Sequence, residues 1–483
     1  MRKAPEGLEI TVGKGELKRI GGEFFGFNLE STEFQLSMWD QSARRVAPEV
    51  VSFLRTFDGA VYRFPGGTTA NYYRWRNGTG KVADRPAARI VDWIELPRID
   101  FGLAEYFEFV AQVRGRTWYV LNLQGSFGKP ADAQTLAQEA QALARYTRDN
   151  GVKMLRWELG NELDRAHDMW PHQKYVERAR TMVAAVRAAD PQAEFVGMMS
   201  DYDAQAKTRN VSSSQYNQAV AAALAGLGVN EYEQHSYYDG PPDGPHLPNR
   251  LRQLCRSIED AREAGGPQGQ LGFWVTEHAR WPQPKPGKPW DTSWHQTADL
   301  GAAIGIADML IALTQIPEVR GSSIHALQAT NGPWPLFHKR AGAAAEEPLA
   351  PSVALHAYGI LRQAMLPVVL PSTSSSSSKS GYAGGYDARG AILVSEDRKR
   401  FSAWSVNRRA TKLPVTLEIP ELAGRKTNAK LRYVSADDTA AHNYDKPDSV
   451  LPREQEISLS FDGSGRAVYA VPALSVATLI MPF

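Results

Sequence analysis

The sequence predicts an α/β fold, a (β/α)8 barrel of the TIM type, followed by an all-β sandwich. Eight short apolar runs alternate with segments of helical periodicity between about residues 20 and 366. No glycine-rich phosphate loop follows the first run, because the glycines of "GGEFFGFNLES" stand before it. After residue 385 the pattern changes to short alternating strands broken by turns, which is typical of a sandwich.

Each predicted barrel strand is a short run rich in β-branched or aromatic residues. The eight runs are "EFFGFNL" (23–29), "AVYRFPG" (60–66), "RTWYVLNL" (116–123), "KMLRWEL" (153–159), "EFVGMM" (194–199), "NEYEQHSY" (230–237), "LGFWVTE" (271–277) and "GSSIHAL" (321–327). Between them, one helix begins at an Asp132 cap and ends at Asn150-Gly151. Another ends before Pro191, and the long apolar stretch 293–317 predicts a helix packed against the barrel. A doubly wound open sheet is the alternative arrangement.

The chain divides into three predicted parts. Residues 20–368 form the barrel, and residues 369–483 form the sandwich. The short strand "LEITVG" (8–13) within residues 1–19 has no role in a barrel, so we expect it to join the sandwich. The Ser/Gly-rich segment 370–385 predicts an exposed loop.

Composition excludes several classes of function. The 55 Lys and Arg balance 53 Asp and Glu, and no basic stripe stands out, so we expect no nucleic-acid partner. The single cysteine, Cys255, permits no intrachain disulfide, and its place in a helical pattern predicts a buried thiol. No apolar run reaches the length of a membrane span, so we expect no membrane partner. The oligomeric state stays open.

The first residues, "MRKAPEGLEI", carry charge but no apolar core of a signal peptide. A protein whose signal had been removed would look the same. We therefore expect an extracellular or periplasmic protein if a signal was trimmed, and a cytoplasmic one otherwise.

Polar side chains gather at the carboxyl ends of the predicted strands, where TIM barrels carry their chemistry. The candidates are Glu30 after the first strand, Arg63 on the second, Asn122 at the end of the third, Asn161 and Glu162 after the fourth, His235 and Tyr237 on the sixth, Glu277 and His278 at the seventh, and Asn331 and Trp334 after the eighth. Glu162 and Glu277 should face each other across the barrel mouth.

Two facing carboxylates with opposite roles are what glycosidic bond cleavage requires. One must give a proton to the leaving oxygen while the other stays ionised and attacks the anomeric carbon. Arg63 is placed to keep Glu277 ionised, and the Tyr237 hydroxyl can donate to the same carboxylate. Asn161 can bond a ring hydroxyl next to the reacting carbon.

We expect no metal and no other cofactor. His167, Asp168 and His172 in "DRAHDMWPH" have the residue types of a metal site. A solvated helix start explains them better.

These motifs resemble those of the clan A retaining glycosidases. "RFPGGTTANYYRW" is similar to the second-strand motif of α-L-arabinofuranosidases, and "FFGFNLES" is similar to their first strand, in which a Glu binds the sugar. "RWELGNEL" also resembles the heparanase and β-glucuronidase relatives, whereas "TEHARW" differs from the D-E-W-N usual in arabinofuranosidases. The resemblance implies that Glu162 is the acid/base and Glu277 the nucleophile. It makes Arg63, Asn161, His235 and Tyr237 their supports.

The sequence therefore predicts a retaining glycoside hydrolase that acts on plant or bacterial polysaccharides or their oligosaccharides. An exo-acting, α-L-arabinofuranosidase-like enzyme is favoured, because Glu30 would close the pocket and the segment after strand two offers Tyr72, Tyr73, Trp75 and Trp93 as a wall. A β-glucuronidase or heparanase-like enzyme, a β-xylosidase and an endo-glycanase are the enzymatic alternatives. A non-catalytic carbohydrate-binding barrel is the alternative outside enzymes.

Overall fold

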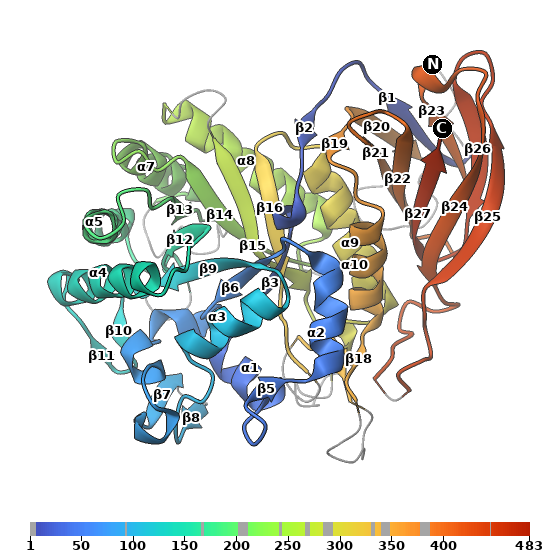
Figure 1. Ribbon diagram of the computed structural model, residues 1–483. Helices are drawn as coiled ribbons and strands as arrows, with labels where there is room; N and C mark the ends of the chain where they lie inside the picture. Colours follow the sequence, from blue (N-terminus) through green and yellow to red (C-terminus); the bar gives the residue numbers. More distant parts are fainter. Residues whose placement is uncertain are drawn as a thin grey trace.

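Eight parallel strands close into a barrel in the computed structural model of the chain (Figure 1). The structure describes residues 6–91, 94–165, 169–200, 211–240, 244–265, 271–283, 293–329, 334–339, 348–376, 387–444 and 446–483. The barrel strands in order are β3 (Phe25–Asn28), β6 (Val61–Phe64), β9 (Arg116–Leu121), β12 (Arg156–Leu159), β13 (Phe195–Met198), β14 (Glu231–Tyr238), β15 (Gly272–Arg280) and β16 (Val319–Ile324). Each lies within or overlaps one of the eight predicted runs. The predicted barrel is confirmed, and the open-sheet alternative is wrong because β16 pairs with β3.

Helices surround the barrel on its outer face. They are α1 (Ser31–Ser37), α2 (Pro48–Leu54), α3 (Leu103–Gln112), α4 (Ala133–Asp149), α5 (His172–Arg187), α7 (Ser213–Ala225), α8 (Leu247–Glu263), α9 (Leu300–Thr314) and α10 (Val353–Gln363). The Asp132 carboxylate accepts from the Thr135 amide, so the predicted cap starts α4. The Asp299 carboxylate accepts from the Ala302 amide and caps α9 in the same way.

Helix α9 is apolar on all sides and buried along nearly its whole length. Trp294–Thr314 is long and apolar enough to cross a membrane by length and composition, and 94% of its apolar window is buried inside the protein. The expectation that no run reaches this length was therefore wrong. The burial gives the physical reason, since a helix that packs between a barrel and a sandwich needs apolar side chains on every face.

The sandwich consists of two packed sheets at the upper right of Figure 1. Its strands are β1 (Leu8–Val12), β2 (Lys18–Arg19), β19 (Val368–Val369), β20 (Ser372–Ser376), β21 (Ala388–Val394), β22 (Arg400–Asn407), β23 (Leu413–Glu418), β24 (Lys426–Ser435), β25 (Arg453–Ser460), β26 (Arg466–Val471) and β27 (Ser475–Pro482). One sheet has the order β20-β1-β23-β26, and the other β2-β19-β21-β22-β27-β24-β25.

Strand β1 lies inside the smaller sheet, antiparallel to β20 and parallel to β23. The serine-rich segment predicted as a loop is therefore in part a strand, because Ser372–Ser376 pairs with β1 along its whole length. Backbone hydrogen bonds hold such a strand without apolar side chains, which is why its composition did not predict it. The remainder of that segment, 377–386, lies outside the described residues.

The sandwich has a hydrophobic core of its own, and one further cluster continues from the barrel into the sandwich. Trp404, Val406, Val434 and Val476 of the sandwich belong to the same buried cluster as the barrel strands and helices. Phe25 of β3 packs edge-on to Trp404, with 6.1 Å between ring centroids. The sandwich therefore covers apolar surface that the barrel cannot cover alone.

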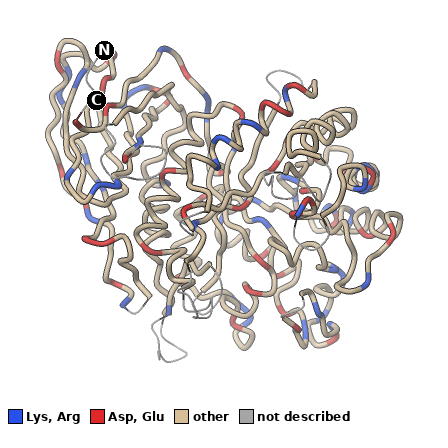
Figure 2. Tube along the Cα trace, turned by 180° about the vertical axis from the view of Figure 1, so that it is seen from behind, with Lys and Arg blue, Asp and Glu red and all other residues tan. Residues whose placement is uncertain are grey.

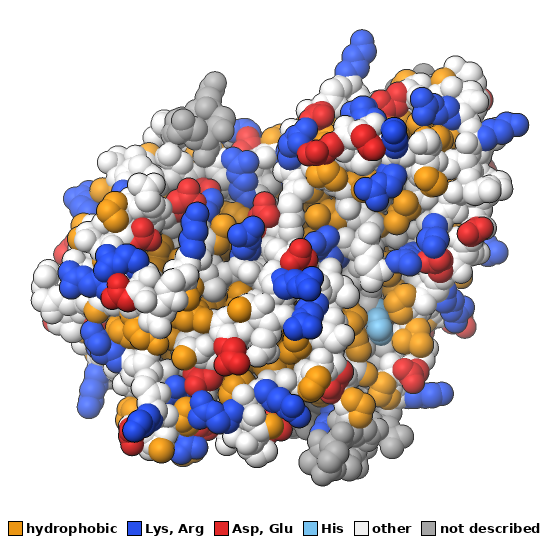
Figure 3. All heavy atoms as spheres, viewed as in Figure 1, with side chains coloured by type: hydrophobic (Ala, Val, Ile, Leu, Met, Phe, Trp, Pro, Cys, Tyr) orange, Lys and Arg blue, Asp and Glu red, His pale blue; other side chains and the backbone are white. Residues whose placement is uncertain are grey.

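The surface carries both signs of charge without a large field of either. Lys and Arg alternate with Asp and Glu along the trace in Figure 2 and over the face in Figure 3. Cys255 lies on the exposed side of α8. The prediction of a buried thiol was wrong, since the buried face of α8 carries Leu254 and Ile258 instead.

The described residues also include four short two-stranded sheets. They are β4 (Trp39–Asp40) with β5 (Arg45–Val46), β7 (Ala88–Val91) with β8 (Ile94–Leu96), β10 (Gly125–Ser126) with β11 (Lys129–Pro130), and β17 (Phe337–His338) with β18 (Ala350–Pro351).

Candidate active site

Two glycines after β6 make room for the side chains at the end of β3. Gly66 and Gly67 have φ values of 59° and 54°, a backbone region that favours glycine. A Cβ at Gly67 would overlap the Glu30 carboxylate, and a Cβ at Gly66 would lie only 2.5 Å from the Asn28 amide oxygen. The "PGG" motif therefore lets Asn28 and Glu30 reach the barrel mouth.

Glu162 stands directly beyond β12, where the chain turns sharply. Gly160 has a φ of 87° and Glu162 itself has a φ of 49°. Positive φ at a glutamate is uncommon and strained, and it occurs most often where a side chain is aimed for function. The Glu162 carboxylate lies 2.8 Å from Nδ1 of His235 on β14 and is 20% exposed.

Glu277 lies on β15 with its side chain almost fully buried. Its Oε1 accepts from Nη1 of Arg63 at 2.6 Å, and its Oε2 accepts from the Tyr237 hydroxyl at 2.6 Å. An oxygen of Glu277 and an oxygen of Glu162 lie within 4.8 Å of each other. The two carboxylates therefore face one another over one small space.

Arg63 is fully buried, and its guanidinium binds several side chains of the site. Its Nε and Nη2 grip both oxygens of Glu158 at 2.8 and 2.6 Å. Its Nη1 also reaches the Asn28 amide oxygen at 2.7 Å, and its Nη2 reaches the Asn161 amide oxygen at 2.8 Å. With the oxygen of Asn161 held in this way, its amide nitrogen is the group that can donate to a sugar hydroxyl.

The surroundings of Glu277 favour its ionised form. Burial acts to raise the pKa of Glu277, but positive charge from His235, His325 and Arg63 together with the Tyr237 hydrogen bond lowers it well below the ordinary value. Burial lowers the pKa of His325 to about 4, so near neutral pH His235 and Arg63 supply that charge. Glu277 is thus an anion ready to attack.

The proton that an acid would need lies between Glu162 and His235. Burial acts to raise the pKa of Glu162, but the hydrogen bond from His235 and the charge of Arg165 leave it below its ordinary value. Burial acts to lower the pKa of His235, but the carboxylates around it, Glu277 first, raise it to about 9. The sequence predicted a protonated acid at neutral pH, whereas here the imidazole carries the proton, 2.8 Å from Glu162.

Glu30 and His325 lie next to each other, with His325 also 3.5 Å from Glu277. The two side chains lie 3.7 Å apart, and Nδ1 of His325 lies 2.7 Å from the Asn28 amide nitrogen. Burial, together with the nearby Glu33 and Glu277, raises the pKa of Glu30 well above its ordinary value. A neutral Glu30 can both donate to and accept from sugar hydroxyls.

Aromatic rings form one wall beside Glu277. Trp334 lies 5.0 Å from Tyr237 and 5.2 Å from each of Trp281, Trp294 and His325, measured between ring centroids. Flat aromatic faces of this kind suit sugar rings. The sequence left Trp334 open between core and sugar platform, and the structure places it against the residue that binds the nucleophile.

Other predicted residues serve local structure. The Asn122 amide bonds the backbone of Tyr73, Gln124 and Gly125, so it shapes its own loop and not the site. Trp75 is buried against Tyr146 of α4, with 5.5 Å between ring centroids, so it packs the loop after β6. Tyr72 and Tyr73 are likewise buried. Trp93, His167, Asp168 and Asn331 lie outside the described residues, and His172 begins α5.

Sequence reasoning missed three residues of the site: Glu158, Glu233 and His325. The first two are interior residues of β12 and β14, and both are fully buried. Isolated acids within predicted strands were the available signal, because a barrel interior rarely takes a lone carboxylate without a partner. Glu158 is bound by Arg63 from another strand, and Glu233 contacts Thr276 on β15 and His235 on its own strand.

Within the described part of the chain, two side-chain groups have the spacing of a metal site, and both include His235. These groups are Glu158 with Glu233 and His235, and Glu162 with His235 and Glu277. The guanidinium of Arg63 already binds Glu158 and Glu277 and supplies positive charge there. This arrangement fits a cationic side chain in the role that a metal ion would otherwise take.

Part of this chain is similar in sequence to known arabinofuranosidases. A family model described as the alpha-L-arabinofuranosidase 1 domain matches residues 53–240. The intracellular exo-alpha-(1->5)-L-arabinofuranosidase of Streptomyces lividans is 24% identical over 248 residues, which are 49% of this chain and 36% of the relative. The exo-alpha-(1->6)-L-arabinofuranosidase of Bifidobacterium longum is 27% identical over 161 residues, which are 31% of this chain and 30% of the relative. The matched region thus spans well under half the length of these curated relatives.

The whole architecture is similar to solved structures. The GH51 arabinofuranosidase from Xanthomonas axonopodis pv. citri aligns with a TM-score of 0.78 at 17% identity and covers 98% of this chain and 99% of its own. The alpha-L-arabinofuranosidase of Thermotoga maritima, solved as an arabinose complex, aligns with a TM-score of 0.77 at 16% identity and covers 99% and 100%. The barrel with its appended sandwich is therefore the fold that this chain shares with those arabinofuranosidases.

Proposed function

We propose that this protein is a retaining glycoside hydrolase with exo-acting, α-L-arabinofuranosidase-like activity. The observation that carries the proposal is the pair Glu162 and Glu277, whose oxygens come within 4.8 Å of each other. Retaining glycosidases place their two carboxyl groups about 5–5.5 Å apart, whereas inverting ones need room for a water molecule. The substrates are terminal sugar residues of plant or bacterial polysaccharides or of their oligosaccharides.

The reaction proceeds by double displacement. Glu277, ionised and held by Arg63 and Tyr237, attacks the anomeric carbon and forms a glycosyl-enzyme. Glu162 gives a proton to the departing oxygen, and His235 holds the carboxylate in place. In the second step Glu162 takes a proton from water, and the hydroxide oxygen displaces Glu277 with the original anomeric configuration restored.

The α-L-arabinofuranoside assignment is supported by the family model and by the names of the relatives. A β-glucuronidase is less well supported, because a uronate carboxylate calls for a free cationic donor. Arg63, the cation at Glu277, is already committed to Glu158 as well. A non-catalytic barrel gives no reason to keep a buried Arg63 with two carboxylates, since an apolar core would be at least as stable.

A panel of aryl glycosides tests the proposal. Hydrolysis of an aryl α-L-arabinofuranoside should exceed that of the β-D-xyloside and β-D-glucuronide, and proton NMR should show the retained anomer first. Monosaccharide should appear from an arabinan from the start, with little fall in viscosity. Early inverted product overturns the mechanism, and turnover of another glycoside alone overturns the substrate class. Early oligosaccharides overturn exo action, and no turnover of any glycoside favours the binding protein.

A further inference from the structure

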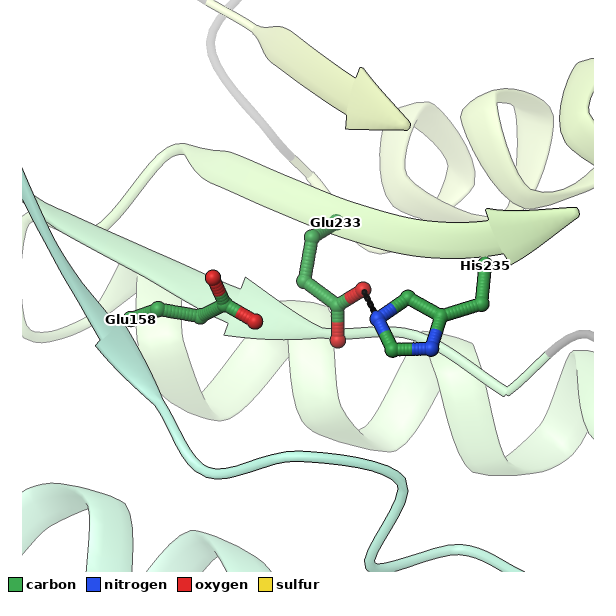
Figure 4. Close-up of side chains that lie close together, drawn as sticks. All are labelled: Glu158, Glu233 and His235. Carbon is green, nitrogen blue, oxygen red and sulfur yellow. Dashed lines mark ion pairs between the residues drawn. The ribbon is translucent and has the colours of Figure 1, made fainter. Parts of the chain in front are cut away.

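A second layer of polar side chains lies directly beneath the two facing carboxylates. Figure 4 shows Glu158 of β12 pointing toward Glu233 and His235 of β14. The Glu233 side chain is fully enclosed in the barrel interior and accepts from the Thr276 hydroxyl at 2.9 Å. Its Oε2 lies 3.4 Å from Nε2 of His235, along the dashed line of Figure 4.

His235 joins the upper and lower layers through its two ring nitrogens. Nδ1 faces upward, 2.8 Å from Glu162 and 3.4 Å from Glu277. Nε2 faces downward to Glu233 and makes no hydrogen bond within the structure. The state of one nitrogen of a histidine is set by what the other nitrogen contacts, so Glu233 is placed to govern Nδ1.

The consequence for Glu162 follows from the chemistry of imidazole. A neutral ring carries one proton. If that proton sits on Nε2 and points to Glu233, then Nδ1 is an acceptor and the proton shared with Glu162 resides on the carboxyl oxygen. If the proton sits on Nδ1, Glu162 is held as a carboxylate and cannot serve as an acid. The Glu233 carboxylate, as an acceptor at Nε2, therefore favours the tautomer that leaves the shared proton on Glu162, as general-acid catalysis needs.

We propose that Glu233 is a positioning residue for the acid/base, acting through His235 to place the shared proton on Glu162. The inference rests on the proposed function for its kinetic consequence. Near neutral pH the His235 ring is an imidazolium with a proton on each nitrogen. During the first step the Nδ1 proton moves to Glu162 and on to the leaving oxygen, which leaves a neutral ring whose one proton stays on Nε2 against Glu233. No electron transfer or co-reactant is involved.

The charges around His235 and Glu233 are consistent with this role. Burial raises the pKa of Glu233 to about 8, with Glu158 adding to the effect and His235 opposing it. The titratable or charged groups that face this pair include Glu158 from β12, Arg63 from β6, Glu277 from β15, Tyr237 from β14, Tyr175 from α5, Glu162 and Arg165 from the turn after β12, and His325 from the segment after β16. The protonation of His235 and Glu233 can therefore change with pH while the groups around them keep their positions.

The variant Glu233→Gln tests the proposal, because it keeps an acceptor of the same size but removes the ionisable group. Without that negative charge the imidazolium loses stabilisation, so the shared proton is lost at lower pH. We expect the alkaline limb of kcat/KM to move about one pH unit toward acid. At a pH on the plateau, turnover of an activated aryl glycoside should stay within about twofold, whereas an unactivated substrate should lose about tenfold or more.

Glu231→Gln is the matched control on the same strand. Glu231 bonds Arg156 and the Trp274 indole and has no contact with His235. It should change thermal stability and leave the pH profile unchanged. Coincident alkaline limbs for wild type and Glu233→Gln, or equal losses on activated and unactivated substrates, would overturn the proposal and assign Glu233 a structural role.

A measurement on the unaltered protein keeps the proposal testable if the variant does not fold. In protein labelled with ¹⁵N-histidine, His235 should titrate near pH 9 and show the Nε2–H tautomer above that pH. The Nδ1–H tautomer, or titration at the ordinary value for histidine, overturns the inference. This spectrum needs no substrate, so its failure is separate from a failure of the proposed glycosidase activity.

Discussion

Nη1 of Arg63 donates to Oε1 of Glu277 across 2.6 Å, and neither side chain is more than 3% exposed. The same guanidinium holds Glu158 with its other edge. One buried cation therefore balances two buried anions and ties the nucleophile to the barrel floor. Removing either side of such a pair is costly because the remaining charges stay buried.

Replacing Arg63 with Ala should lower the free energy of unfolding by about 3–5 kcal/mol, because Glu158 and Glu277 are left without their partner. Arg63→Lys keeps the charge but loses the planar set of guanidinium donors. Compared with Arg63→Ala, it should therefore recover part of the stability and little activity. Denaturant titration and kcat/KM measure both effects. Arg156→Ala is the control, since Arg156 pairs with Glu231 and Glu194 instead. Full activity in Arg63→Ala would contradict this account.

Variants at the two carboxylates should differ in which substrates they still cleave. Glu277→Ala should abolish turnover of all glycosides, because no other group is placed to form the glycosyl-enzyme. Glu162→Ala should spare glycosylation by activated aryl glycosides, whose leaving groups need no proton, and azide should then release a glycosyl azide. Stopped-flow bursts and product analysis check this. Equal inactivity of Glu162→Ala on activated and unactivated substrates would reverse the assigned roles.

Tyr237→Phe should shift the acid limb of the pH profile. The pKa of Glu277 is depressed, and the Tyr237 hydrogen bond at 2.6 Å contributes to that. Losing the bond raises this pKa, so Glu277 becomes protonated at higher pH and the acid limb of kcat/KM moves toward neutral. A lost bond to a charged group also costs about tenfold or more in rate. Tyr238→Phe is the control, because its hydroxyl contacts His278. An unmoved acid limb in Tyr237→Phe would refute the assignment.

Glu30→Gln should reduce kcat/KM on terminal sugars while leaving the fold intact. Glu30 is 13% exposed and lies beside His325, where it can hold hydroxyls remote from the reacting bond. Such contacts strengthen partly in the transition state, so kcat should fall along with affinity. Kinetics on aryl glycosides and a polymer digest measure this. An unchanged rate together with an early oligosaccharide profile would indicate an open cleft.

The barrel produced alone, residues 20–368, should be insoluble or much less stable than the whole chain. The truncation removes Trp404, Val406, Val434 and Val476 from the shared core and exposes Phe25 and α9 beneath them. Buried apolar area of this kind contributes about 25 cal/mol per Å². Sedimentation and thermal unfolding test it. A soluble, fully active barrel would show that the sandwich is dispensable.

The sequence predicted the barrel well because parallel barrel strands are buried on both faces and read as uninterrupted apolar runs. It also placed Glu162, Glu277, Arg63, His235 and Tyr237 at strand ends, and the structure brings these five together. Each of them stands on or just after a predicted strand near its carboxyl end, and the order of their motifs resembles that of a known family, so this part of the site could be read from the sequence.

The lower layer could not be predicted in the same way. Glu158, Glu233 and Arg63 meet only when three separate strands close the barrel, and their pairing depends on register. Asn122 was predicted for the site because it ends a strand, yet its amide makes three short-range bonds in its own loop and one to the backbone of Tyr73 in the loop after β6. Cys255 was wrongly predicted to be buried, because helical periodicity does not tell whether other elements will cover a residue at the edge of an apolar face.

Strand β1 lies between β20 and β23, and Leu8 is paired with both Ser376 and Val415. During synthesis this segment is made before the barrel, whereas its partners are made after the barrel. The barrel can begin to close from successive βα units while β1 remains an unpaired edge, and such edges recruit other strands. Completion of the smaller sheet is therefore a late, highly non-local event, and a chain interrupted before β23 would carry an exposed strand that favours aggregation.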